Sequence, residues 1–151
     1  MQRAGRTELT IVDALLLAIL STVVLAIAIP LLQTATDHVR QATLLDNLRT
    51  LRSQIELYKL EHRGNPPILR EGALPQMIRP TNDEGITGIG RSDFPHGPYL
   101  KEGVPLNPIT GRSVITLTDE FPPRKASGNG GWLYHQPSGQ IVPDLPKFLD
   151  N

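Results

Sequence analysis

The sequence contains no cysteine, and this absence excludes several kinds of chemistry together. Without a thiol the chain can form no disulfide bond, no thiolate metal site and no cysteine nucleophile. Excess charge is absent too, because fifteen basic residues balance fifteen acidic ones. Proteins that bind nucleic acid usually carry a basic surface, so this balance predicts no direct nucleic-acid partner.

Motifs typical of catalysis are also missing. The chain has four histidines, which are His38, His62, His96 and His135. None of them forms a His-x-x-x-His pair or another arrangement with the spacing of metal ligands. The glycine-rich stretch at residues 85–90 lacks the lysine and the preceding strand of a phosphate-binding loop, and no Gly-x-Ser-x-Gly motif occurs. We therefore predict that the protein is not an enzyme.

Proline and glycine are scarce in the first part of the chain. Of 14 prolines and 13 glycines, only Gly5 and Pro30 precede residue 64. Because these two residue types interrupt helices, residues from about 7 to 63 are predicted to form a nearly continuous helix. The sequence Gly-Asn-Pro-Pro at 64–67 ends it, since glycine suits the position after the last helical turn and proline cannot continue a helix.

The first half of this helix is apolar. No charged residue lies between Asp13 and Asp37. A helix needs roughly 20 apolar residues to cross a bilayer, so residues 9–32 are predicted to form a transmembrane helix. Arg3 and Arg6 precede it, and the positive-inside rule then places the N-terminus in the cytoplasm.

Three interpretations of residues 9–32 remain open. The first is a cleaved secretory signal, because Ala26-Ile27-Ala28 is similar to a small-x-small cleavage site, although the apolar run continues beyond it. The second is an ordinary signal anchor, which fits the hydropathy equally well. The third gives Asp13 a role in pairing with another charged group, because a carboxylate at the start of an apolar run is costly to bury unless it is paired. An aspartate that simply lies at the membrane interface is the plainer explanation of that residue.

The spacing of residues 9–30 resembles the N-terminus of type IV pilins and pseudopilins. Those proteins carry a short basic leader, a glycine at the cleavage site, an apolar first mature residue, an acidic fifth residue and a proline at mature position 22. Counting Leu9 as the first mature residue puts Asp13 fifth and Pro30 twenty-second. Two positions differ from the family pattern, because Glu8 stands in place of the glycine and the acidic residue is aspartate instead of glutamate.

The resemblance implies a role for each of these positions. A prepilin peptidase would cut between Glu8 and Leu9, and the new amine of Leu9 would then be methylated. Asp13 would neutralise the terminal amine of a neighbouring subunit within a filament, which is the pairing that a buried carboxylate needs. Pro30 would locally loosen the helix, because it removes one backbone hydrogen bond.

The second half of the long helix is amphipathic. One apolar stripe recurs at steps of four and three residues, and it consists of Leu44, Leu48, Leu51, Ile55 and Tyr58. We expect this stripe to pack against the C-terminal domain. Leu45, Leu57 and Leu60 lie partly off the stripe, and they either contact other subunits or widen the core face. Residues 46–67 also resemble the corresponding helix and Gly-x-Pro-Pro-like turn of the major pseudopilins of type II secretion.

Strand signals occur only near the C-terminus. Residues 113–118, 131–135 and 140–142 are rich in β-branched, aromatic or aliphatic residues, and Pro-Ser-Gly at 137–139 predicts a hairpin turn between the last two. Three short antiparallel strands packed on one long helix would bury the apolar face of the sheet and that of the helix.

Calcium is the one cofactor that the resemblance raises, because major pseudopilins often bind it in a loop near the C-terminus. The available oxygen donors there are Asp119, Glu120 and Asp144. Basic residues follow the first two closely, and an aspartate-rich ligand loop is absent. We therefore predict no cofactor, and these three residues are the calcium candidates if one is bound.

Together these features predict an α+β fold, in which one long N-terminal helix packs on a small three-stranded antiparallel sheet. The predicted parts are a basic leader at 1–8, a transmembrane helix at 9–32, an amphipathic helix at 33–63 and a loop-rich C-terminal domain at 64–151. The resemblance implies a structural subunit of a type II secretion pseudopilus or a type IV pilus-like filament, assembled through its N-terminal hydrophobic helix.

The implied partners are other copies of the chain, the prepilin peptidase, an assembly ATPase, a platform protein and minor pseudopilins. The implied location is the bacterial inner membrane, crossed once, with a cytoplasmic N-terminus and a periplasmic C-terminal domain. The alternative is a single-span membrane protein that does not polymerise and whose periplasmic domain binds a partner.

Overall fold

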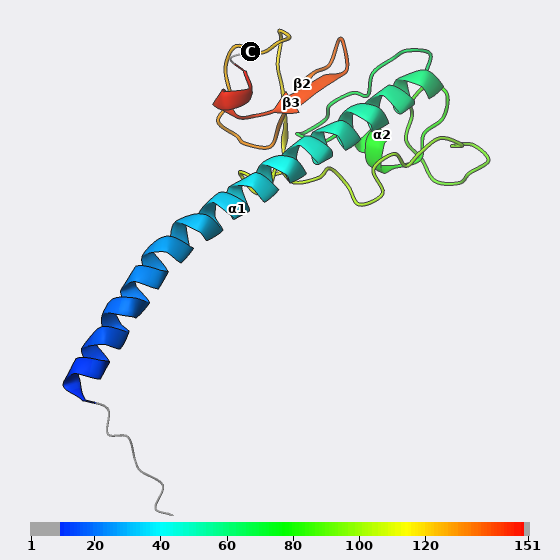
Figure 1. Cartoon of the computed structure of the whole chain (residues 1–151). Helices are drawn as coiled ribbons and strands as arrows, with labels where there is room; N and C mark the ends of the chain where they lie inside the picture. The colour runs from blue at the N-terminus through cyan, green and yellow to red at the C-terminus, as the bar shows by residue number, and fades with distance from the viewer. Residues whose placement is uncertain (1–9, 150–151) are drawn as a thin grey trace, which may run out of the picture. The chain divides into compact units, whose positions relative to one another are not determined.

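The computed structural model describes residues 10–149, apart from the side chains of residue 25 and of residues 27–35. The elements in chain order are helix α1 (Ile11–Glu61), helix α2 (Pro75–Ile78), strands β1 (Ile115–Leu117), β2 (Trp132–His135) and β3 (Gln140–Pro143), and the 3-10 helix η1 (Pro146–Phe148) (Figure 1). The chain divides into two compact units, residues 1–39 and residues 40–151. Helix α1 contributes to both units, and the other elements belong to the second.

Helix α1 ends in a left-handed backbone turn. Arg63 and Gly64 have positive φ angles of 57° and 84°, and the Gly64 amide donates to the Lys59 carbonyl at 2.8 Å. Glycine adopts this conformation without strain, and the bond satisfies a carbonyl that the helix end would otherwise leave unpaired. Pro66 follows closely and has no amide hydrogen with which to extend the helix.

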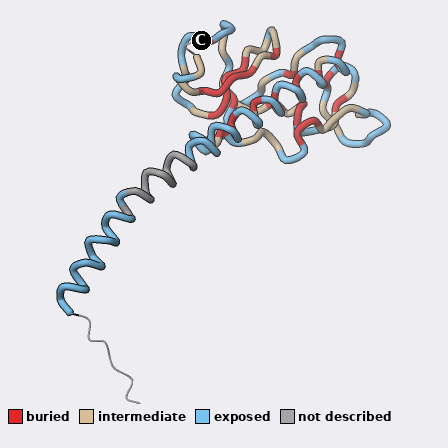
Figure 2. Tube along the Cα trace, in the orientation of Figure 1, coloured by how far each residue is buried: buried red, intermediate tan, exposed pale blue. Residues whose placement is uncertain are grey.

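The hydrophobic core of the second unit is built on the apolar stripe of α1. All five residues of the stripe are buried, with exposed fractions of 7% or less (Figure 2). They share one core cluster with Met77 of α2, Trp132 and Tyr134 of β2, and Ile141 of β3. Each large apolar side chain contributes about 1.5–3 kcal/mol when it is removed from water, so this stripe accounts for much of the stability of the unit.

The sheet differs from the predicted one in its topology. Its three strands lie in the order β1-β2-β3, with β3 antiparallel to β2 but β1 parallel to β2. The prediction of an antiparallel sheet is therefore wrong. Parallel neighbours need a connection of about a dozen residues or more, and residues 118–131 are long enough to return the chain to the other end of the sheet. The Trp132 amide then donates to the Val114 carbonyl at 2.9 Å and joins the starts of the two strands.

The prediction of a transmembrane helix at residues 9–32 is also wrong. Among residues 10–149, no helix combines the length and the apolar character that crossing a membrane requires.

The predicted location depended on the same span. The placement in the bacterial inner membrane, with a cytoplasmic N-terminus and a periplasmic C-terminal domain, is therefore overturned by the finding on the described helices. The alternative of a single-span protein that does not polymerise loses its span for the same reason.

Candidate assembly surface

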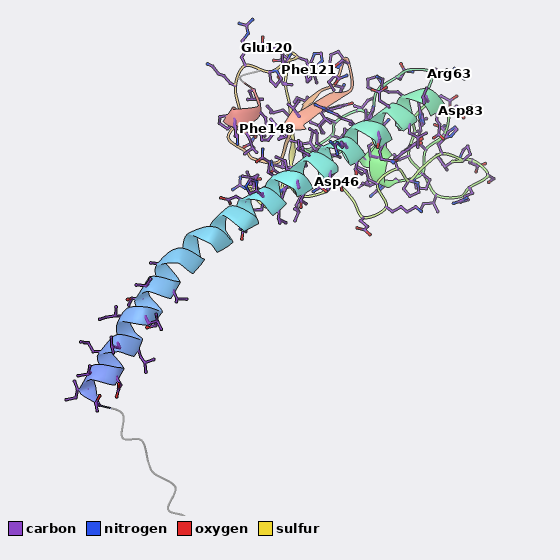
Figure 3. The ribbon with its side chains drawn as sticks, viewed as in Figure 1. Asp46, Arg63, Asp83, Glu120, Phe121 and Phe148 are labelled. Carbon is purple, nitrogen blue, oxygen red and sulfur yellow. The ribbon has the colours of Figure 1, made fainter. Side chains whose placement is uncertain are left out.

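The N-terminal turns of α1 expose a continuous set of large apolar side chains, with exposed fractions from 52% to 89%. The set, called here the apolar helix surface, is Ile11, Val12, Leu15, Leu16, Leu17, Ile19, Leu20, Val23 and Val24. Successive helix residues are rotated by about 100°, so these positions lie on most sides of the helix. Figure 3 shows side chains projecting to both sides of this segment. A helix that is apolar on most sides is normally buried, which makes this surface the main candidate for a protein contact.

The two hydroxyl side chains within this stretch do not oppose its burial. Ser21 Oγ donates to the Ala18 carbonyl at 2.9 Å, and Thr22 Oγ1 donates to the Ile19 carbonyl at 2.7 Å. Because each hydroxyl hydrogen is bonded within the helix, contact with an apolar partner leaves neither donor without an acceptor. Another helix can therefore cover this surface without the usual penalty for burying polar groups.

A capping box formed by Thr10 and Asp13 starts α1. The Asp13 amide donates to Thr10 Oγ1 at 3.3 Å, while the Thr10 amide and hydroxyl donate to Asp13 Oδ2 at 3.0 Å and 2.6 Å. These bonds pair groups that a helix N-terminus otherwise leaves without partners. They also lower the pKa of the Asp13 carboxyl, and the bond from the Thr10 hydroxyl is the larger cause. The Thr-x-x-Asp pattern is a sequence signal for such a box, but the sequence analysis considered only a place at the membrane interface or a role between subunits for Asp13.

The other predicted processing and assembly residues lie partly outside the described region. Glu8 and Leu9, between which cleavage is predicted, are outside the described residues. Pro30 lies within the bounds of α1, and the helix continues through that position, although its side chain is not among those described. The predicted roles of these three residues stay predictions.

The three leucines off the apolar stripe lie outside the core. Leu45 and Leu57 are 38% and 41% exposed, and Leu60 is 81% exposed. The hydrophobic cluster of the second unit contains none of them among the described residues. Of the two interpretations offered by the sequence, contact with another molecule therefore agrees better with the structure than a wider core face does.

The three calcium candidates have separate surroundings. Asp119 and Glu120 line one surface hollow, where Arg124 Nε lies 3.3 Å from Glu120 Oε2. Asp144 is buried, and it accepts bonds from the Ser127 amide at 2.7 Å and the Ser127 hydroxyl at 2.6 Å. Within residues 10–149, no three His, Cys, Asp or Glu side chains are grouped so that they could hold a metal ion. Asp144 instead ties the loop before β2 to the end of β3, a contact that no sequence motif indicated.

Comparison of the chain with protein-family models, with curated proteins and with solved structures gives no match. The resemblance to type IV pilins and pseudopilins thus rests on the residues from Leu9 to Pro30, on the helix and turn at 46–67 and on the loop at 98–111, and it stays a prediction. The features that bear on function are those of the chain itself: the apolar helix surface, its capping box and the exposed leucines of α1.

Proposed function

We propose that this chain is a structural subunit of a filament of the type IV pilin and type II secretion pseudopilin kind. The observation that carries the proposal is the apolar helix surface, whose nine large side chains are all at least half exposed. Copies of the chain bury this surface by packing their N-terminal helices together, while the second unit of each copy provides the folded outer part of the filament.

The hydrophobic effect supplies the driving force for this assembly. Burial of a Val, Leu or Ile side chain contributes about 1.5–3 kcal/mol when it is complete, so partial burial of nine such side chains yields on the order of 10 kcal/mol for each subunit. Association costs translational and rotational freedom of comparable size, so the surface must be covered on more than one side. A bundle of several helices covers it in this way, whereas a simple dimer covers it on one side only.

The geometry of Asp13 agrees with a second role at a contact between subunits. Both bonds from Thr10 end on Oδ2, and Oδ1 takes no bond from the described residues. Oδ1 is therefore the atom that would accept a bond from the terminal amine of a neighbouring subunit. Such a pair would also compensate the charge of the carboxylate once apolar helices surround it.

The partners follow from the same proposal. A prepilin peptidase would expose Leu9 as the N-terminus, an assembly ATPase and a platform protein would drive polymerisation, and minor pseudopilins would accompany the chain in the filament. Leu45, Leu57 and Leu60, exposed on the second half of α1, would contribute further contacts between subunits.

The test uses the full chain, expressed together with a prepilin peptidase, an assembly ATPase and a platform protein of a type II secretion system. Filaments are measured by electron microscopy and by pelleting. The double variant Leu16→Gln with Leu20→Gln should abolish filaments, because each buried amide without a partner costs about 1–3 kcal/mol at every repeat of the assembly. Ile89→Gln is the matched control, since it removes an equally apolar and 96% exposed side chain from the second unit.

Two results would contradict the proposal. One is a native chain that forms no filaments with the assembly components present. The other is a Leu16→Gln, Leu20→Gln chain that folds and polymerises like the native one.

A second pair of variants separates the two roles of Asp13. Thr10→Ala breaks the capping box and leaves the carboxylate, whereas Asp13→Asn removes the charge and keeps an oxygen that can cap. If Asp13 pairs with an amine of another subunit, Asp13→Asn stops assembly and Thr10→Ala permits it. Filaments from Asp13→Asn in the same yield as from the native chain would show that assembly does not need the charge of Asp13.

A further inference from the structure

The connection between β1 and β2 contains the dipeptide Asn129-Gly130, which places an electrophile beside a nucleophile. The side-chain amide of an asparagine can be attacked by the backbone nitrogen of the next residue, because the two close a five-membered ring. Glycine hinders that attack least, since it has no Cβ. Asn129 is exposed, and Gly130 is half-buried with a φ of +71°. The pair is therefore open to an intramolecular reaction.

The other asparagines of the described residues lack one or more of these conditions. Asn65 and Asn107 precede prolines, which have no amide hydrogen to lose. Asn47 lies inside α1, where the next amide is bonded within the helix. Asn82 precedes an aspartate, and its Oδ1 accepts a bond from a backbone amide at 2.8 Å that holds the side chain in place. In the described part of the chain, Asn129 alone is followed by glycine.

The amide nitrogen of Gly130 is available as the nucleophile. Among the described residues it donates no hydrogen bond, although the amides on both sides of it do. The Asn129 amide donates to Ser127 Oγ at 3.2 Å, and the Gly131 amide donates to Thr110 Oγ1 at 3.3 Å. No protein bond therefore has to break before the Gly130 amide loses its proton.

Arg112 lies where it favours the loss of that proton. Its Nη1 donates to the Asn129 carbonyl at 2.8 Å, and this carbonyl belongs to the same peptide group as the Gly130 nitrogen. A Cβ added to Gly130 would lie 3.3 Å from Arg112 Cδ, so the stem of the arginine also lies against the reacting peptide. When the nitrogen is deprotonated, resonance moves negative charge onto the carbonyl oxygen. The permanently charged guanidinium thus stabilises the anion more than the neutral peptide.

The side chain of Asn129 is held by one weak contact. Its Nδ2 donates to Thr116 Oγ1 at 3.2 Å, which is at the long end of the usual range. Asn129 and Arg112 also line a surface hollow of about 480 Å³, which gives water access to both. The side chain can therefore turn toward the Gly130 nitrogen, and water can reach the product of the attack.

We propose that Asn129 and Gly130 form a self-modification site, which converts asparagine to aspartate and isoaspartate with Arg112 activating the nucleophile. The deprotonated Gly130 nitrogen forms a bond to Cγ of Asn129, and the Cγ–Nδ2 bond breaks as Nδ2 takes up protons from water and leaves as ammonia. The product is a cyclic imide. Water then adds at Cγ to give aspartate or at the main-chain carbonyl carbon to give isoaspartate. No atom is oxidised or reduced, and water is the only other reactant.

The isoaspartate product lengthens the main chain by one carbon at a tightly held place. Before this position, Ser127 is bonded to Asp144, and after it, Gly131 packs against the backbone oxygen of Val114. The added length lies between these two fixed points, so the contact that holds β1 beside β2 must shift. Both products also place a new negative charge near Arg112. The reaction is independent of the proposed assembly, because every residue in it belongs to the second unit.

The test follows the full native chain in a mild detergent during incubation at mildly alkaline pH, which favours loss of the amide proton. Digestion and mass spectrometry detect at each asparagine the mass gain that replacement of NH2 by OH causes, and chromatography separates isoaspartyl from aspartyl peptides. Conversion should be confined to Asn129 among the described asparagines. The converted chain should unfold at lower urea concentration, measured by the fluorescence of Trp132. Asn129→Gln should abolish conversion there, because its longer side chain would have to close a six-membered ring.

Variants of arginine test whether the fold assists the reaction. Arg112→Gln should slow conversion about two- to fivefold, as expected for a charge at an exposed site. In urea the contact of Arg112 with the peptide is absent, so the native chain and this variant should convert equally fast. Arg91→Gln is the matched control, because it removes an exposed guanidinium from another loop, and it should leave the rate unchanged. Arg112→Lys should keep most of the rate, since it retains a charged donor.

Three results would overturn the proposal. The first is a folded native chain that shows no conversion at Asn129 while the same chain in urea is converted. The second is an equal rate for the folded native chain and folded Arg112→Gln, or Arg112→Lys as slow as Arg112→Gln, which would contradict the role of the arginine charge. The third is an equal slowing by Arg112→Gln in urea, which would assign the effect to the local sequence instead of the fold.

Discussion

Replacement of Gly131 by alanine should destabilise the second unit far more than the same change at Gly128. Gly131 precedes β2 with a φ of +78°, and a Cβ added there would lie 2.2 Å from the backbone oxygen of Val114. Gly128 has a similar φ of +81°, and an added Cβ would meet nothing within 4 Å. The two positions therefore share the backbone strain and differ in the contact that holds β1 beside β2.

The expected difference can be worked out from these contacts. Positive φ costs an alanine about 1–2 kcal/mol at either position, and the stiffer unfolded chain returns about 0.4–1 kcal/mol of it. At Gly131 the Val114 oxygen can move only if the strands separate, which adds about 1–3 kcal/mol for overpacking. The hydrogen bond from the Trp132 amide to that oxygen contributes about 1 kcal/mol more. The net expectation is about 3–5 kcal/mol for Gly131→Ala and about 1 kcal/mol for Gly128→Ala.

The assay is urea unfolding of the full chain, kept monomeric in a mild detergent. Fluorescence of Trp132 reports the transition, because it is the only tryptophan and is fully buried in the core. The slope of the free energy of unfolding against urea concentration should be the same in both variants. The change in the midpoint then measures the change in the free energy of unfolding. Equal losses at the two glycines would refute the reasoning, because they would show that the approach of Gly131 to Val114 does not hold the parallel pair together.

Two further predictions concern buried polar groups. Stability should fall above about pH 10, because the unfolded chain releases tyrosine protons that the folded chain keeps. Burial raises the pKa of Tyr58, Tyr99 and Tyr134, so phenolate absorbance and unfolding should rise together; phenolate in a folded chain would contradict this. Asp144→Ala should cost about 2–4 kcal/mol in urea unfolding and Ser127→Ala only about 1 kcal/mol, because the carboxylate accepts two bonds and the hydroxyl donates one of them. Equal losses would argue against this clamp.

Local patterns predicted much of the secondary structure. The stripe from Leu44 to Tyr58 is buried because the helical period places its members on one face, whichever element covers them. Gly64 ends α1 because its backbone reaches a positive φ without strain. The strands lie at 115–117, 132–135 and 140–143, inside or beside the stretches that their β-branched and aromatic residues indicated.

Contacts between distant segments were beyond prediction from local patterns. Whether β1 runs parallel or antiparallel to β2 depends on the path of residues 118–131, and their composition specifies only a loop. The bonds between Asp144 and Ser127 join residues 17 positions apart, so no spacing rule applies to them. The bonds of His62 with Thr81 and Asn82 likewise require the loop after α2 to fold back on the end of α1.

Part of the candidate assembly surface could also be predicted from local sequence patterns. Its apolar residues can be read directly from the sequence, because a charge-free run is a property of composition. The capping box of Thr10 and Asp13 was equally readable, since it lies within a single turn. The membrane span inferred from residues 9–32 was wrong, because no described helix meets the requirement for one.

The sequence by itself determined where α1 is apolar on most sides, which face of its second half is apolar and where it ends, since these features depend on neighbours within about four residues. Only the tertiary structure decided the mixed sheet, the burial of Asp144 and the contact of the loop after α2 with His62 at the end of α1. Each of these depends on which distant groups meet after the chain has folded. Their free energies come from pairs whose distance in space is unrelated to their distance in sequence.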